Sequence, residues 1–134
     1  MIDIEFELFT EIATALRAEY DGIFVTGEYV AQPPRFPAVS IVEMDNTVFR
    51  NGIDSGAIEN YAEVMYQVDV YSNKHTGRKA ECKEIISMID EQFARFGFTR
   101  SFLNPVQNMN DATIYRMTAR YRAVVDRNFN VYGR

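Results

Sequence analysis

Residues 61–71 alternate between two kinds of side chain along their whole length. One set is apolar or aromatic and comprises Ala62, Val64, Tyr66, Val68 and Val70. The other is more polar and comprises Tyr61, Glu63, Met65, Gln67, Asp69 and Tyr71. This period of two is typical of a β-strand with one buried face. Residues 113–126 repeat it, with Tyr115, Met117, Ala119, Tyr121, Ala123 and Val125 on one face. Two such strands predict a fold built around a β-sheet.

Two other segments, residues 2–20 and 79–96, have the periodicity of amphipathic helices. Apolar side chains recur every four residues in both, at Leu8, Ile12, Leu16, Ile85, Ile89 and Phe93. Gly22 and Gly97 follow these segments and suit the position after a helix end. Shorter strands are predicted at 23–26, 38–43 and 98–103. Strands in runs with only two helices indicate an α+β fold, with an antiparallel or mixed sheet and both helices packed on one face.

The remaining segments are predicted to be loops and turns that connect the helices and strands. Three prolines within 32–37 exclude that stretch from a central strand, because proline has no N–H. Asn51-Gly52 is a strong hairpin-turn signal, so residues 45–60 are expected to form a projecting loop. Residues 104–111 are expected to be a loop, and 127–134 a flexible polar tail. Residues 1–134 then form a single domain.

Composition limits the class of protein. The chain has 134 residues, of which 47% are hydrophobic and 25% charged, as in ordinary globular domains. Its net charge of −5 argues against wholesale wrapping of nucleic acid, which requires many cations. Cys82 is the only cysteine, so no intrachain disulfide can form. An acidic start and the lack of a long apolar run predict a soluble protein of the cytoplasm.

No residue pattern specifies catalysis. His75, the only histidine, lies in a polar connection, where a solvated side chain is the default expectation. Cys82 lies near a predicted helix start, a position that can lower a thiol pKa, although an ordinary packing role is the simpler interpretation. The chain has neither a glycine-rich phosphate loop nor a calcium-loop pattern. We therefore expect no enzyme activity, no metal and no cofactor.

Two stretches are candidate contact surfaces. Alternation places Arg116, Arg120 and Arg122 on one strand face, where they could pair with Glu63 and Asp69 across the sheet, contact an acidic partner or follow a phosphate backbone. Residues 47–58 mix apolar side chains with turn residues, which is typical either of an association surface or of a loop folded back on its own sheet. The candidate interface residues in this second stretch are Val48, Phe49, Arg50, Ile53, Asp54 and Ile58.

Three segments together resemble the small tail-terminator, or tail-completion, proteins of long-tailed bacteriophages. They are Tyr66-Gln67-Val68-Asp69-Val70-Tyr71-Ser72-Asn73 leading into Gly77-Arg78-Lys79-Ala80, then Gly97-Phe98-Thr99-Arg100 continuing to Leu103-Asn104-Pro105-Val106, and Ile114-Tyr115-Arg116-Met117-Thr118-Ala119-Arg120-Tyr121. The likeness covers roughly residues 36–132. Its motifs reflect packing rather than chemistry, so they assign no functional residue.

The resemblance implies a virion protein of the tail or neck, assembled in the cytoplasm of a bacterial host. Its subunits would form a ring, typically a hexamer, that contacts the tail-tube protein and the head–tail connector. DNA would pass through the lumen without specific binding, and no membrane would be involved. The alternatives are another neck protein, a small enzyme whose interface site uses His75 and Cys82, and a nucleic-acid-binding module that uses the three arginines.

Overall fold

The computed structural model describes residues 1–48, 61–108 and 111–133. The elements follow one another along the chain as α1 (Glu5–Glu19), β1 (Phe24–Thr26), β2 (Ala38–Val48), β3 (Tyr61–Ser72), α2 (Arg78–Arg95), β4 (Thr99–Val106), β5 (Tyr115–Asp126) and β6 (Val131–Gly133). In the described part of the chain, the strands form one mixed sheet, in the order β1-β2-β3-β5-β4. β1 pairs with β2 in parallel, and the remaining pairs are antiparallel.

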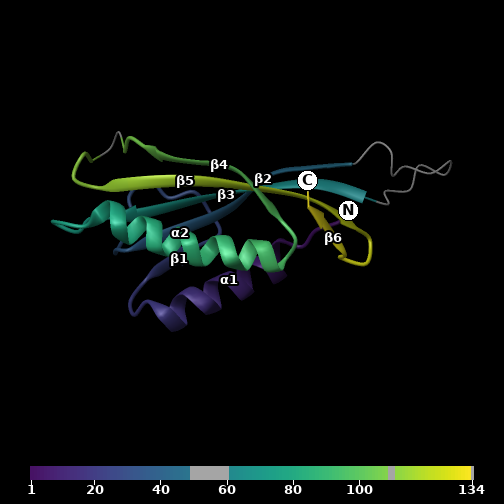
Figure 1. The fold of residues 1–134 in the computed structure, drawn as a ribbon, viewed down its shortest axis with the longest axis horizontal. Helices are drawn as coiled ribbons and strands as arrows, with labels where there is room; N and C mark the ends of the chain where they lie inside the picture. Colours follow the sequence, from purple (N-terminus) through teal and green to yellow (C-terminus); the bar gives the residue numbers. More distant parts are fainter. Residues whose placement is uncertain (49–60, 109–110, 134) are drawn as a thin grey trace.

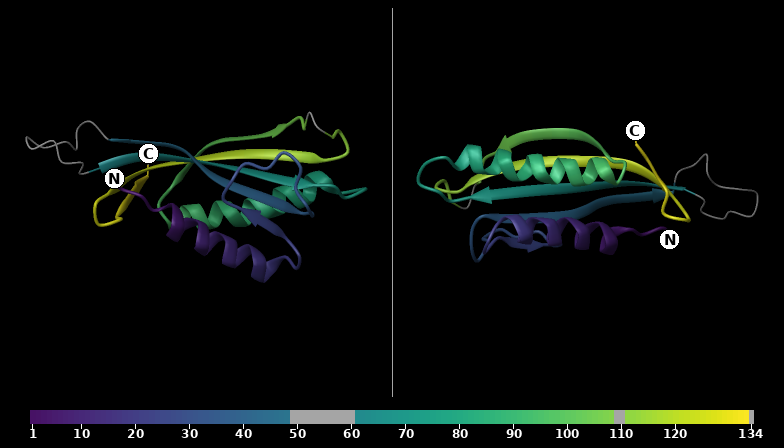
Figure 2. Two further views of the ribbon diagram at one scale, coloured as in Figure 1. Left: turned by 180° about the vertical axis from the view of Figure 1, so that it is seen from behind. Right: turned by 60° about the horizontal axis from the view of Figure 1, so that its bottom comes forward.

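The register joins the two alternating strands over their whole length. Tyr66 lies opposite Tyr121, and Gln67 lies opposite Arg120, so the apolar sets of β3 and β5 share one face of the sheet. Both helices cover this face, where they lie side by side (Figure 1, Figure 2). The predicted fold class, an α+β fold with a mixed sheet and two helices, is therefore confirmed. The opposite side of the sheet is called the outer face below.

The core lies between the helices and the sheet. Its helical side chains include all six predicted from the four-residue spacing: Leu8, Ile12, Leu16, Ile85, Ile89 and Phe93. An aromatic cluster occupies the region beneath α2. The ring of Phe93 stacks on Tyr121, with centroids 4.0 Å apart, and meets Phe98 edge to face at 5.3 Å. Neither helix of the described structure is long and apolar enough to span a membrane.

Three expectations from the sequence are wrong. The projecting loop expected from residue 45 begins later, because β2 continues to Val48, which pairs with Ala62 of β3. The loop expected from residue 104 begins later, because β4 continues through Pro105 to Val106. β4 lies at the end of the sheet order, and an edge strand tolerates proline because one side of its backbone needs no ladder partner. The flexible tail expected at 127–134 contains β6, which pairs with Ala123, Val124 and Val125 of β5. β6 thus occupies the part of β5 that lies beyond its pairing with β4.

Gly97 connects α2 to β4 in a left-handed conformation, with φ 89°. A Cβ atom placed there would lie 3.2 Å from the carbonyl oxygen of Val131 and 3.3 Å from its Cγ1 atom. Gly22 follows α1 with φ 76°, but a Cβ atom there would meet nothing within 4 Å. The two glycines therefore share the backbone requirement and differ in available space.

We expect Gly97→Ala to destabilise the protein more than Gly22→Ala. The left-handed backbone should cost Gly22→Ala about 1–2 kcal/mol. Gly97→Ala should lose the same amount of stability, and its added methyl group should also crowd Val131 of β6. Urea unfolding of both variants checks the difference. Equal losses of stability in the two variants would show that β6 accommodates the added methyl group without strain.

Candidate interaction surfaces

The three predicted arginines lie on the outer face, and each is engaged by a neighbouring strand. The Nε atom of Arg116 lies 3.0 Å from Oδ1 of Asp69, and the Nε atom of Arg120 donates to Oε1 of Gln67 over 3.0 Å. Arg122 pairs with Glu63 at 3.7 Å, and its side chain is 49% exposed. Cross-strand pairing with Asp69 and Glu63, one of the predicted alternatives, is therefore observed for Arg116 and Arg122, whereas Arg120 contacts Gln67.

Asp69 is the centre of this outer-face network. Its side chain is only 3% exposed and accepts hydrogen bonds from Arg116, Gln67 and the hydroxyl of Thr118. Nearby, the hydroxyl of Tyr71 donates to the carbonyl oxygen of Val30 over 3.1 Å, so the connection between β1 and β2 reaches this part of the sheet. Hydrogen bonds from several donors offset the cost of burying a polar side chain. The network's evident role is to hold β3 and β5 in register.

Arg116 and Arg120 also lie against aromatic rings. The guanidinium of Arg116 is 5.7 Å from the ring centroid of Tyr71, and that of Arg120 is 5.1 Å from Phe102. These contacts add cation–π attraction to the polar pairing. Of the three predicted arginines, Arg122 therefore keeps the most solvent-accessible charge.

The second predicted surface is only partly within the described structure. Val48 is the last residue of β2 and is 47% exposed. Phe49, Arg50, Ile53, Asp54 and Ile58 lie outside the described residues. The structure thus shows an exposed apolar side chain at the start of this stretch, and the wider interface there stays a prediction.

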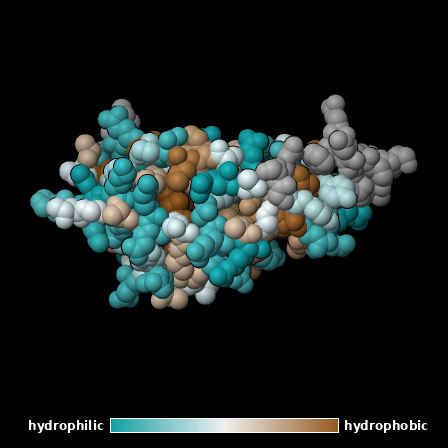
Figure 3. Space-filling model, in the orientation of Figure 1, coloured by the Kyte–Doolittle hydropathy of each residue, from teal (hydrophilic) through white to brown (hydrophobic). Residues whose placement is uncertain are grey.

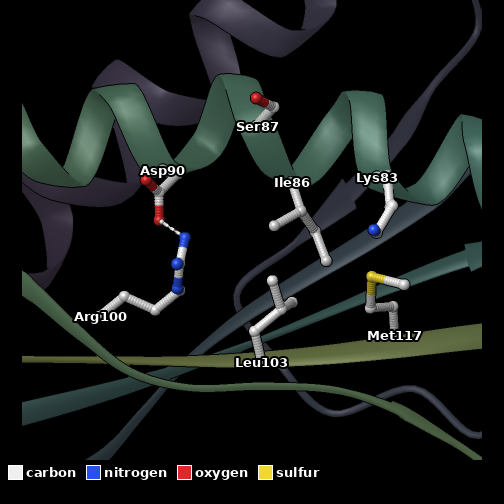
Figure 4. Close-up of a pocket in the computed structure, with 7 residues that line it drawn as sticks. All are labelled: Lys83, Ile86, Ser87, Asp90, Arg100, Leu103 and Met117. Carbon is white, nitrogen blue, oxygen red and sulfur yellow. Dashed lines mark hydrogen bonds and ion pairs between the residues drawn. The ribbon is translucent and has the colours of Figure 1, made fainter.

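A groove between α2 and the edge strand β4 was not predicted (Figure 4). It has a volume of about 260 Å³ and is lined by Lys83, Ile86, Ser87, Asp90, Arg100, Leu103 and Met117. Apolar side chains from both elements face each other in it, and Arg100 pairs with Asp90 at 2.9 Å at one end. The surface view shows the corresponding apolar patch between the sheet and α2 (Figure 3). These residues are called the α2–β4 groove.

A partial signal for this groove exists in the sequence. Lys83, Ile86, Ser87 and Asp90 recur at helical spacing and therefore share one side of α2. That side mixes polar and apolar residues, so periodicity alone does not mark it as a binding surface. Leu103 and Met117 join it only through the pairing of β4 with β5.

The other edge of the sheet carries an acidic and aromatic surface. A shallow depression of about 300 Å³ is lined by Asp3, Glu5, Phe6, Phe9, Gly27 and Glu28, and these residues are called the α1 patch. Phe6 is 76% exposed. Burial raises the pKa of the neighbouring Glu43, and the carboxylates of Asp3 and Glu5 add to this rise against the opposing hydrogen bond from Tyr66. The α1 patch itself contains three acidic residues, Asp3, Glu5 and Glu28.

The structure gives His75 and Cys82 no common site. His75 is exposed in the turn before α2, whereas Cys82 is completely buried against the sheet. Burial, with a smaller contribution from Glu81, raises the pKa of the Cys82 thiol to about 12. A lowered pKa at the helix start, the reactive alternative, is therefore contradicted. The described residues contain no group of three or more His, Cys, Asp or Glu side chains that could hold a metal ion.

Cys82 should resist thiol reagents in the folded protein. With a pKa of about 12, its thiolate fraction at pH 8 is on the order of one in ten thousand, and the core blocks reagent access. We expect negligible labelling by a chromogenic disulfide reagent at pH 8 and one thiol per chain in urea. Rapid labelling without denaturant would show that the region around α2 opens readily.

No protein-family model matches the chain, and no curated protein matches it.

Proposed function

We propose that the protein is a tail terminator of a long-tailed bacteriophage. In this role it is a structural subunit, without enzyme activity, that forms a hexameric ring at the head-proximal end of the tail tube. The ring stops tube polymerisation and offers a docking surface to the head connector. DNA passes through its lumen without being read.

The observation that carries this proposal is the placement of two unlike surfaces at opposite sheet edges. The α1 patch adjoins β1, and the α2–β4 groove adjoins β4, which are the first and last strands of the sheet order. Copies that contact each other through two different patches associate head to tail, and such contacts close into a ring when the rotation permits. A subunit with this layout suits a ring better than a two-fold dimer.

The three segments that resemble tail terminators are neighbours in the fold. The first runs along β3 and into α2, the second leaves α2 and follows β4, and the third lies in β5. β5 pairs with both β3 and β4, so the segments form one continuous unit. Their adjacency supports a likeness of fold, because scattered chance matches need not converge on one sheet.

The charge distribution favours the ring over a nucleic-acid-binding module. Arg116 and Arg120 are engaged by Asp69 and Gln67, so using them on phosphates would require breaking these contacts. The net charge of −5 also repels DNA at long range. An acidic subunit suits a channel through which DNA must slide.

The test is the mass of the purified protein, measured by light scattering after size exclusion, with and without polymerising tail-tube protein. We expect either a discrete ring or a smaller species that assembles at tube ends and limits tube length. A persistent monomer that leaves tube length unchanged would overturn the proposal. Binding to a portal or connector without any effect on tubes would point to another neck protein.

A further inference from the structure

The α2–β4 groove is poorly suited to receive an added β-strand. β4 carries an irregularity in register between Arg100 and Phe102, and Pro105 lacks the N–H that a ladder requires. Bulges and prolines are common means by which edge strands avoid pairing with other chains. A partner at this edge is therefore expected to dock through side chains.

The dimensions and lining of the groove suit one apolar side chain. Its volume of about 260 Å³ lies below the roughly 300–1,000 Å³ of pockets that hold drug-sized ligands. Ile86 and Met117 form its nearly buried floor, and Leu103 forms a half-buried wall. An inserted aromatic ring would contact apolar atoms from the helix and from both strands.

The charge beside the groove complements the α1 patch. Lys83 lines the groove, and Lys79 lies one helical turn before it. Both are exposed, and neither forms an ion pair with another described residue. In the α1 patch, Asp3 and Glu5 line the same depression as the exposed side chain of Phe6. A second copy of the chain thus presents an aromatic side chain beside carboxylates to a groove beside lysines.

We infer that Phe6 of one copy inserts into the α2–β4 groove of the next, with Glu5 facing Lys83. This inference rests on the proposed self-association and names its contact. The two surfaces lie at opposite edges of the sheet, so each copy would use its α1 patch on one neighbour and its groove on the other. Exposed aromatic side chains that enter pockets commonly dominate interface energetics.

Cross-linking between two variants, each with one cysteine added to the native Cys82, tests the contact directly. Glu5→Cys and Lys83→Cys proteins are mixed at high concentration and treated with a short thiol-specific cross-linker, while the buried Cys82 stays protected. We expect mixed dimers to form faster than either variant alone forms its own dimers. Faster Glu5→Cys dimerisation on its own would indicate a two-fold contact and overturn the inference.

Substitutions that exchange the charges of Glu5 and Lys83 measure how much the proposed contact contributes to self-association. Phe6→Ala and Lys83→Glu should each weaken association by at least about tenfold, and Glu5→Lys combined with Lys83→Glu should restore it to within about threefold. Glu11→Lys, an exposed change further along α1, is the matched control and should have little effect.

The outcomes separate this inference from the proposed function. An oligomer that is insensitive to Phe6→Ala and Lys83→Glu would overturn the named contact and leave the ring proposal standing. A monomer at every concentration, with no mixed cross-link, would also overturn the contact. The tube-length assay would then decide the proposed function independently.

Discussion

Replacing Phe93 by alanine should lower the free energy of unfolding by about 3–5 kcal/mol. Phe93 is completely buried, and its ring stacks on Tyr121 while also packing against Phe98 and Tyr66. Its removal would leave a cavity between α2 and the sheet that rigid aromatic neighbours can fill only in part. Urea unfolding followed by circular dichroism would measure the loss.

Phe6→Ala is the matched control, since it removes the same side chain from an exposed position of α1. Its effect on the stability of the monomer should stay within about 0.5 kcal/mol. Similar losses in the two variants would contradict the placement of Phe93 in the core. The comparison also separates the stability of the fold from the self-association proposed for Phe6.

Replacing Asp69 by asparagine should cost about 3–5 kcal/mol, the range observed when one partner of a buried ion pair is removed. The substitution keeps the shape of the side chain but removes the charge that faces Arg116, whose side chain is only 17% exposed. It also places an amide donor where Thr118 and Gln67 already donate. Equilibrium unfolding in urea, fitted with a shared slope, would give the difference.

Glu63→Gln provides the comparison on the same two strands. The pair of Glu63 and Arg122 is longer, at 3.7 Å, and both side chains are more exposed than those of Asp69 and Arg116. Its loss should cost about 0–1 kcal/mol. If Asp69→Asn costs no more than Glu63→Gln, the outer-face network does not hold the register of β3 and β5.

The sequence alone predicted the features that depend on short-range periodicity. The alternation in β3 and β5 identified which side chains face the core, because neighbouring residues of a strand must point to opposite faces. The four-residue spacing in α1 and α2 did the same for the helices. The strand alternation also offered Glu63 and Asp69 as possible partners of the arginine stripe, since side chains on the same face of paired strands come within reach of each other.

The tertiary structure decided the features that depend on which distant segments become neighbours. Residues 104–106, expected in a loop, belong to β4 at a sheet edge, and the polar C-terminal stretch gives no indication that β6 extends the sheet beside β5. Cys82 lies near the start of α2 as predicted, but only the packing of the helix on the sheet shows that it is completely buried. The α2–β4 groove joins residues of a helix and two strands. No local pattern specifies such a surface, because it exists only once long-range pairing has fixed the positions of these elements.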